Sequence, residues 1–496
     1  MSFRAQRAGL DDIPTVGYDG FLTSYISAFH FIIRGGVIIQ EGYRKFPGKA
    51  FKIALPDRWL VIVTGQRMIQ DIRKASDNVL SFSEAAEEVA HEFIAPRSLQ
   101  MLIYYVNRNT IGKIIRSDPW HFDIVRGTLT KKIASKFPEI HDEMIAAFAD
   151  ELPVSDDWIE VPIERAAHRI RLNIQYTQDL MSTAGLLIIT PKFLQSLVGW
   201  LASPRRWHFP RAHKLLRPVI LERFEMLRKP ELEHETPDDF LTWLIKNATT
   251  NERADPENVT TAVLSTNIAA ILTTVGFCVN DFDFLVLVKR PFYNIEYGRF
   301  ALAFTHALVD LASHPELIGP LRCEVEEVLA KDGWTKTAMG NMLMLDSFLM
   351  ESQRVSNSNP FGLLRKSLCD FIFSDGTVVP EGTFIATAPR ALHFDESHYI
   401  DPNHFDGLRF QRLREEFGNN FKYRMVTPGD NWLSFGAGRH SCPGRFFAVN
   451  ELKALVSYTL LKYDIKVDDL DKSKRLEFAG RIATDPTSRL LLRNRV

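Results

Sequence analysis

The chain has 496 residues, of which 45% are hydrophobic and 24% are charged, and its formal net charge is −1. This composition is that of an ordinary globular protein, so disordered and fibrous classes are excluded. A net charge near zero gives no global basic excess for binding phosphates, and no local basic patch stands out. We therefore expect no nucleic-acid partner. The length allows one large domain or two closely joined ones.

The cysteine pattern excludes two further classes. Cys278, Cys323, Cys369 and Cys442 are scattered without a CxxC pair. Such spacing indicates neither a disulfide framework nor a zinc knuckle, and a reducing compartment is the default expectation. The first residues lack the apolar core of a secretory signal peptide. The most apolar stretch, residues 261–280, is interrupted by polar side chains, so it predicts a buried helix and not a membrane span.

The predicted elements are mostly helices. Apolar runs at residues 51–56 and 59–64 predict a β-hairpin. Helical periodicity then dominates, at residues 173–183, 258–274, 300–313, 317–330 and 339–355. Within residues 371–385, an Asp-Gly pair predicts a second hairpin.

The last third of the chain differs from the rest. Periodicity is weak between about 388 and 434, and a loop region of this length in a compact chain is usually either functional or disordered. The segment leads directly into a glycine-rich loop that contains a cysteine, which favours function. The sequence shows no internal repeat, low-complexity tract or linker. We therefore expect residues 1–496 to form a single large domain, mainly α with small β-sheets.

Residues 432–448 carry the most informative motif, Trp-Leu-Ser-Phe-Gly-Ala-Gly-Arg-His-Ser-Cys-Pro-Gly-Arg-Phe-Phe-Ala. Gly436 and Gly438 let the backbone turn tightly before Cys442, and Gly444 permits an unusual dihedral or close packing after it. A helical pattern begins at Arg445. A thiolate just before a helix N-terminus is stabilised by the helix dipole and by backbone N–H groups. The alternative is that Cys442 is a small buried hydrophobic residue.

This motif resembles the haem-binding loop of the cytochrome P-450 superfamily, Phe-x-x-Gly-x-(Arg/His)-x-Cys-x-Gly. The resemblance implies a haem domain in which Cys442 is the metal ligand of haem b (iron protoporphyrin IX). His440 stands where many members have arginine, and its ring N–H could reach a haem propionate; in isolation it would be a surface histidine. The cofactor-binding residues that the resemblance implies in this loop are Phe435, Gly436, Gly438, His440 and Gly444. The wording of the motif is closest to the fungal membrane-bound enzymes.

Two further motifs extend the resemblance. Glu351-Ser-Gln-Arg354 places two charges on one helix face, which alone would be an exposed ion pair of little energetic value. In the family this pair is buried and joined by a later arginine, here Arg409. The segment from Trp120 to Arg126 resembles a helix that sends an arginine to a haem propionate, although Phe122 stands where the family usually has tryptophan. The alternative for Arg126 is an ordinary surface residue.

The stretch Ala269-Ala270-Ile-Leu272-Thr273-Thr274 corresponds to the family's oxygen-activating helix, (Ala/Gly)-Gly-x-(Asp/Glu)-Thr-Thr. The resemblance implies space for dioxygen beside the alanines and makes Thr273 and Thr274 the catalytic candidates for proton relay. Leu272 replaces the usual acid, so solvent or another side chain must complete the proton path. Alternatively, the threonines only bond within their helix.

Residues 275–299 interrupt the helical pattern, which resumes at Phe300. They lack a helical period and contain Gly276, Pro291 and Gly298. We interpret them as an insertion in the central helix, either a true extra loop or a translated intron.

The resemblance implies a monooxygenase that inserts one atom of O2 into an apolar small-molecule substrate by hydroxylation or epoxidation. Electrons would come from a separate NADPH-dependent flavin reductase, because no second cofactor unit appears in the sequence. Two other classes stay open. Leu272 would suit a haem-thiolate isomerase or dehydratase that needs no external electrons, although Thr273 and Thr274 argue against it. The insertion would suit a non-catalytic haem protein.

Localisation is the last expectation. The resemblance implies the cytosolic face of the endoplasmic reticulum membrane. This chain lacks the N-terminal anchor helix that fungal relatives usually carry, and apolar faces near residues 21–38 suggest peripheral membrane contact.

Overall fold

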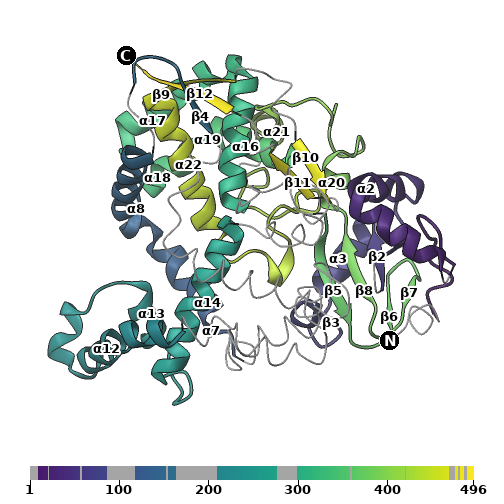
Figure 1. Cartoon of the computed structure of the whole chain (residues 1–496), viewed down its shortest axis with the longest axis horizontal. Helices are drawn as coiled ribbons and strands as arrows, with labels where there is room; N and C mark the ends of the chain where they lie inside the picture. Colours follow the sequence, from purple (N-terminus) through teal and green to yellow (C-terminus); the bar gives the residue numbers. More distant parts are fainter. Residues whose placement is uncertain are drawn as a thin grey trace, which may run out of the picture.

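The structure is a computed structural model that describes residues 9–20, 22–55, 58–85, 118–151, 155–162, 209–275, 299–357, 360–418, 421–467, 475–478, 481–484 and 489–495. It is mainly helical with small β-sheets, which confirms the predicted fold class (Figure 1). The α-helices are α2 (Thr23–Lys45), α3 (Gln66–Lys74), α7 (Trp120–Ile124), α8 (Thr130–Glu151), α12 (Phe209–Arg228), α13 (Phe240–Lys246), α14 (Pro256–Val275), α16 (Arg299–Ser313), α17 (Ile318–Asp332), α18 (Lys336–Asn341), α19 (Leu343–Val355), α20 (Pro389–His393), α21 (Arg409–Phe417) and α22 (Arg445–Lys462). Single turns of other helix types are η2 (Val125–Leu129), η4 (Pro230–Glu235), η5 (Pro315–Leu317) and η6 (Gly438–His440).

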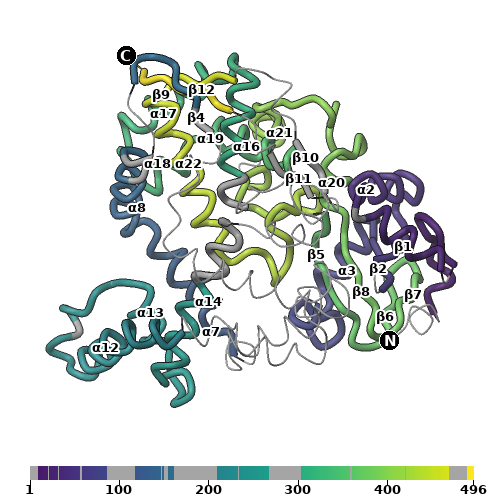
Figure 2. Tube along the Cα trace, viewed as in Figure 1, coloured from purple at the N-terminus to yellow at the C-terminus, as the bar shows by residue number. Residues whose placement is uncertain are grey.

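The strands form four small sheets. A five-stranded sheet has the order β1-β2-β8-β5-β3, from β1 (Ala50–Ala54), β2 (Trp59–Val63), β8 (Phe384–Thr387), β5 (Gly362–Ser367) and β3 (Leu80–Ser81). The others are β4-β12-β9, from β4 (Ile159–Pro162), β12 (Arg489–Asn494) and β9 (Tyr463–Val467), and the pairs β6 (Phe371–Ile372) with β7 (Val378–Val379) and β10 (Arg475–Phe478) with β11 (Arg481–Thr484). Figure 2 shows that strand β4, from the first third of the chain, lies beside the C-terminal strands.

Both predicted hairpins are confirmed. β1 and β2 pair antiparallel, and every residue of both strands is buried, as expected of strands covered on both faces. β6 and β7 also pair antiparallel, and Gly376 in their turn has a φ of +88°, which only glycine adopts without strain. The β-sheet side and the helical side each have their own hydrophobic core.

The helical predictions are confirmed at α14, α16 and α17, but the helix expected at 339–355 is broken in two. Met342, between α18 and α19, has a ψ of 85° and leaves the helical region. The break is stabilised by tertiary partners. Lys453 Nζ donates to the carbonyls of Met339 at 2.9 Å and Met342 at 3.1 Å, and Glu324 accepts backbone N–H groups at the start of α19. Periodicity could not reveal these partners. The helix expected at 173–183 lies outside the described residues.

The central helix resumes where the sequence predicted. α14 ends at Val275 and α16 begins at Arg299, so the first and last residues of the expected insertion 275–299 are helical, and residues 276–298 lie outside the described residues. The two helices contact each other, and in Figure 1 α16 follows α14 in the same direction. None of the helices in the described ranges combines the length and apolar composition that crossing a bilayer requires.

Candidate functional site

Cys442 lies between the short turn η6 and the 18-residue helix α22. As predicted, the two preceding glycines adopt left-handed conformations, with φ values of +67° at Gly436 and +70° at Gly438. A Cβ on Gly438 would lie 3.2 Å from the carbonyl oxygen of Arg73, so a larger residue would also be crowded there. The Cys442 N–H donates to the Phe435 carbonyl at 2.9 Å. These contacts close the loop and place Cys442 three residues before α22.

Gly444 departs from the sequence interpretation. Its φ of −85° and ψ of 1° are ordinary, and an added Cβ would meet no neighbouring atom of the described residues within 4 Å. The idea that Gly444 permits an unusual dihedral or close protein packing is therefore wrong for this fold. Open space remains beside the residue, next to the cysteine.

A guanidinium group accompanies the cysteine. Arg445, the first residue of α22, donates from Nη1 to the Cys442 carbonyl at 2.9 Å and from Nε to the Val426 carbonyl at 3.0 Å. Burial lowers the Arg445 pKa, the Cys442 charge raises it, and Arg126 lowers it. These electrostatic effects place the Arg445 guanidinium near the half-buried Cys442, with Arg126 near Arg445. Cations and a helix N-terminus both favour the thiolate form of a cysteine.

Arg126 reaches the loop from the helical segment formed by α7 and η2. Its Nη2 lies 3.4 Å from the carbonyl oxygen of Arg439, and no carboxylate of the described residues pairs with it. η2 is a π-helical turn, which shifts the register of the helix by adding a residue. In α7, which precedes this turn, Trp120 and His121 are buried at 2% and 1% exposure, whereas Phe122 is 42% exposed. Phe122, which stands where the family usually has tryptophan, is therefore an exposed side chain.

His121 was missed by the sequence interpretation. Burial lowers its pKa to about 4, and its Nδ1 has no hydrogen-bond partner within the described chain. A buried polar atom without a partner is rare in proteins and calls for an explanation. The only sequence signal was its position beside Phe122.

Arg365 was also missed. It lies on β5, is 3% exposed, and its guanidinium stacks 5.5 Å from the ring centre of Phe82. Burial lowers its pKa to about 10, partly offset by the charge of Asp77. His440 contacts the same carboxylate, with Nε2 2.5 Å from Asp77 Oδ1. The alternating strand pattern around Arg365 could have placed it inward, but not near the cysteine loop.

These residues fit the cofactor that the sequence implied. Arg126 and Arg365 lie beside the loop that carries Arg439 and His440, and Asp77 is the carboxylate that interacts with Arg365 and His440. Haem b carries two propionates and an iron atom. Surplus cations, an unpartnered buried imidazole nitrogen and a cation-stabilised thiolate are the donors that such a group requires.

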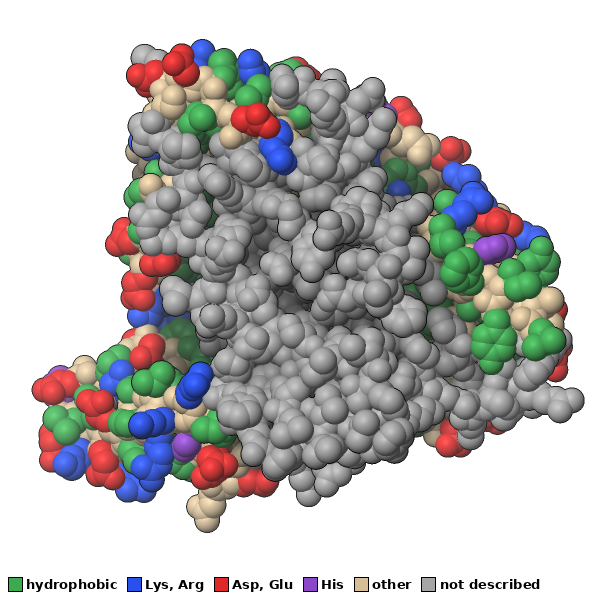
Figure 3. All heavy atoms as spheres, in the orientation of Figure 1, with side chains coloured by type: hydrophobic (Ala, Val, Ile, Leu, Met, Phe, Trp, Pro, Cys, Tyr) green, Lys and Arg blue, Asp and Glu red, His purple; other side chains and the backbone are tan. Residues whose placement is uncertain are grey.

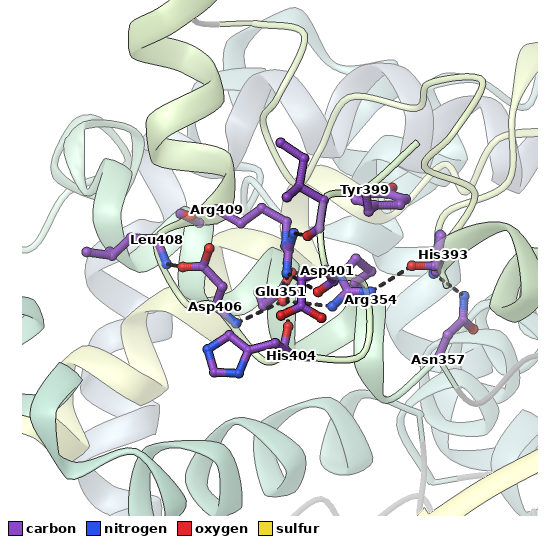
Figure 4. Close-up of polar contacts among 12 residues, drawn as sticks. Glu351, Arg354, Asn357, His393, Tyr399, Asp401, His404, Asp406, Leu408 and Arg409 are labelled. Atoms are coloured by element: carbon purple, nitrogen blue, oxygen red, sulfur yellow. Dashed lines mark hydrogen bonds and ion pairs between the residues drawn. The ribbon is translucent and has the colours of Figure 1, made fainter. Parts of the chain in front are cut away.

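The buried network around Glu351 is confirmed. Glu351 and Arg354 are fully buried and Arg409 is 7% exposed. Arg354 donates to both Glu351 carboxylate oxygens at 2.8 Å, and Arg409 Nε lies 3.1 Å from Oε2 (Figure 4). Arg354 also donates to the His393 carbonyl at 2.6 Å, and Arg409 to the carbonyls of a nearby loop, including that of His404 at 2.9 Å. The network thus joins α19 to the segment leading to the cysteine loop.

The proton-relay candidates are only partly described. Thr273 and Thr274 lie in the last turn of α14, together with Leu272. Their backbone is helical, as predicted, and the placement of their side chains lies outside what the structure describes. The catalytic role of both threonines therefore stays a prediction.

Comparison with known proteins agrees with this geometry. A family model described as cytochrome P-450 matches residues 300–492. Cytochrome P-450 monooxygenase 151 of Postia placenta is 33% identical, over 100% of this chain and 96% of the relative. Monooxygenase 103 of the same fungus is 32% identical, over 97% of this chain and 93% of the relative. A cytochrome P-450 monooxygenase of Ganoderma lucidum is 27% identical, over 92% and 86%.

Proposed function

This chain belongs to the cytochrome P-450 family of haem-dependent monooxygenases, and we propose that it inserts one atom of O2 into an apolar small-molecule substrate with Cys442 as the iron ligand. The observation that carries the proposal is the environment of Cys442. The residue precedes a long helix, follows two left-handed glycines and lies beside the Arg445 guanidinium. This environment favours a thiolate.

Several side chains would hold the haem. When bound, haem b supplies the iron at which dioxygen is activated, and the thiolate ligand assists O–O cleavage. Arg126, Arg365 and His440 would bind the propionates through charge-assisted hydrogen bonds, which are stronger than neutral ones. The neutral His121 imidazole, on the same helical segment as Arg126, would be a further donor for the same carboxylates. The open space beside Gly444 would let a flat group approach the backbone.

Proton delivery would depend on α14. Thr273 and Thr274 carry hydroxyl groups that can pass a proton between water and the oxygen site. Leu272 cannot, because it has no ionisable group. Hydroxylation or epoxidation would therefore draw its protons from solvent or from another side chain, and turnover by Thr273→Ala should release more peroxide per substrate oxidised.

Electrons would come from a separate NADPH-dependent flavin reductase. A chain without a second nucleotide-binding unit needs such a partner, and the sequence contains no strand, glycine-rich loop and helix unit apart from the cysteine loop. Turnover that depends on NADPH and added reductase would support this assignment. Turnover without external electrons would favour the isomerase alternative, and haem binding without any turnover would favour a non-catalytic protein.

We further propose that α2 contacts the endoplasmic reticulum membrane peripherally. Large apolar side chains are exposed at intervals of three or four residues from the N-cap Leu22 through Ile26, Phe29 and Ile33, and at Val37 after the kink at Arg34, each at least 47% exposed. Figure 3 shows hydrophobic side chains gathered at the right-hand edge, over α2. An exposed apolar stripe of this kind is typical of helices that lie in a membrane interface. Phe29→Glu with Ile33→Glu should abolish sedimentation with phospholipid vesicles.

The spectrum of the reduced, CO-bound protein tests the central proposal. We expect the strongly red-shifted Soret band of a thiolate complex in the unaltered protein and its loss in Cys442→Ala. An unshifted band in freshly folded protein, or a shifted band that survives in Cys442→Ala, would exclude Cys442 as the ligand.

A further inference from the structure

Three buried charges outside the Glu351 network meet where α19, α21 and α22 pack together. Asp346 and Arg414 are each 2% exposed, and Lys453 is 4% exposed. The Asp346 carboxylate lies 2.8 Å from Lys453 Nζ and 3.2 Å from Arg414 Nη1. Buried charges persist only when they are paired and hydrogen-bonded, so this carboxylate has a well-defined position.

Asp346 also holds a stretch of irregular backbone. Its Oδ2 accepts the N–H of Met425 at 3.1 Å, and Arg414 donates to the Tyr423 carbonyl at 2.8 Å. The Met425 carbonyl accepts the indole N–H of Trp432 at 3.2 Å. Residues 421–437 contain neither helix nor strand, so these contacts replace the backbone ladder that would otherwise fix them.

The next residue of this segment connects to the cysteine. The Val426 carbonyl accepts Arg445 Nε at 3.0 Å, and Arg445 Nη1 donates to the Cys442 carbonyl at 2.9 Å. A guanidinium group is planar and its donors have fixed directions. A shift of Val426 would therefore turn the Arg445 group and move it relative to Cys442.

We propose that Asp346 is a positioning residue for Cys442. It fixes residues 423–426, and through the Val426 carbonyl it orients Arg445 against the cysteine loop. Asp346 itself makes no hydrogen bond to the loop, so its effect on the sulfur passes through Arg445. The inference rests on the proposed function, in which Cys442 ligates the iron.

The test compares Asp346→Asn with a matched control in the haem-loaded protein. Asn is nearly isosteric with Asp but lacks the charge that Arg414 and Lys453 require. We expect the red-shifted CO band of D346N to convert to the unshifted band about tenfold faster than in the unaltered protein, since a lost charged hydrogen bond is worth about that factor. The control is Glu324→Gln. Glu324 is a half-buried carboxylate that caps α19 and interacts with the same cations, Lys453 and Arg414, but it accepts from Met344 and Leu345 and not from residues 421–426.

Two further measurements decide whether the effect passes through Arg445. The double variant D346N with R445Q should convert no faster than R445Q alone, because contacts in one pathway are not additive. Additive effects would overturn the proposed route. A D346N protein that melts earlier but keeps its thiolate band as long as E324Q does would show a merely structural role and overturn the inference.

Failure to fold would not leave the question open. If D346N gives no haem-loaded protein, R445Q decides alone: conversion about tenfold faster supports the bridge to Val426, and unchanged conversion overturns it. A missing red-shifted band in the unaltered protein would instead contradict the proposed function.

Discussion

Arginine side chains are used differently in the Glu351 network and around the cysteine loop. In the network, Arg354 and Arg409 share one carboxylate and a set of backbone carbonyls, all supplied by the chain itself. Around the loop, Arg126 has no carboxylate partner within the described residues, and Arg365 is buried with an unusually low pKa. The difference indicates that the first group of charges is complete in the protein alone, whereas the second requires an external anion.

The largest expected effect comes from breaking the complete network. Glu351→Gln leaves two buried guanidinium groups without their carboxylate, which should cost about 3–5 kcal/mol of unfolding free energy and abolish haem-loaded protein. Urea unfolding and haem content measure it. The control is Arg412→Gln, whose side chain is 59% exposed in its pair with Asp406 and should matter by less than about 1 kcal/mol. Equal effects of the two variants would mean that the Glu351 network is not a stability determinant.

The next largest effect concerns the segment that connects α14 to α16. Deleting residues 275–299 and joining Thr274 to Phe300 should raise the unfolding free energy by about 3 kcal/mol, the closure entropy of a loop of this length. The contact between α14 and α16, and a family match that begins at residue 300, both favour the deletion. Melting temperature and haem retention should rise together in the deletion variant. If the segment is a translated intron, a spliced transcript should lack the codons for residues 275–299. Loss of haem in the deletion variant, with an active full chain, would show a functional loop.

A lone buried carboxyl provides the contrast to Glu351. Burial raises the Glu451 pKa from 4.5 to about 7, and no partner compensates within the described residues. Between pH 4.5 and 7 the unfolded carboxyl ionises while the folded one stays protonated, so stability falls as pH rises. Glu451→Gln should remove this loss and gain about 3 kcal/mol relative to the unaltered protein at pH 7, and almost nothing at pH 4. Urea unfolding at both pH values, with Glu416→Gln at an exposed position as control, checks the slope.

The smallest expected effect is that of replacing Arg365, and it differs between the haem-loaded and the haem-free protein. Arg365→Leu removes a buried cation whose burial the nearby Asp77 offsets only in part, so the haem-free protein should be no less stable. Haem retention should weaken about tenfold, because one charge-assisted hydrogen bond to a propionate is lost. Haem transfer to an acceptor protein measures haem retention, and thermal melting measures the stability of the haem-free protein. Arg228→Leu, at a position on α12 with a 73% exposed side chain, is the control. If the variant instead destabilised the haem-free protein, the Arg365 charge would be satisfied by the chain itself, like the charges of the Glu351 network.

The sequence by itself determined the local elements and the chemistry of the cysteine loop. Glycine at positions 436 and 438 requires a turn, an Asp-Gly pair ends a strand, and helical periodicity marks α14, α16 and α17, because these effects act over a few residues. It also predicted the three members of the Glu351 network, through the resemblance to a family and not through spacing.

Only the tertiary structure decided which residues far apart in the chain meet. His121 is buried and Phe122 is exposed, because the side that a helix buries depends on how the segment packs. Lys453 and Glu324 stabilise the break at Met342, which periodicity presented as a continuous helix. Arg365 reaches the rim of the cysteine loop, and Asp346 holds Met425, through contacts between segments separated by tens of residues. Hydrogen bonds and burial of this kind depend on distances in space, which a linear pattern of residue types does not contain.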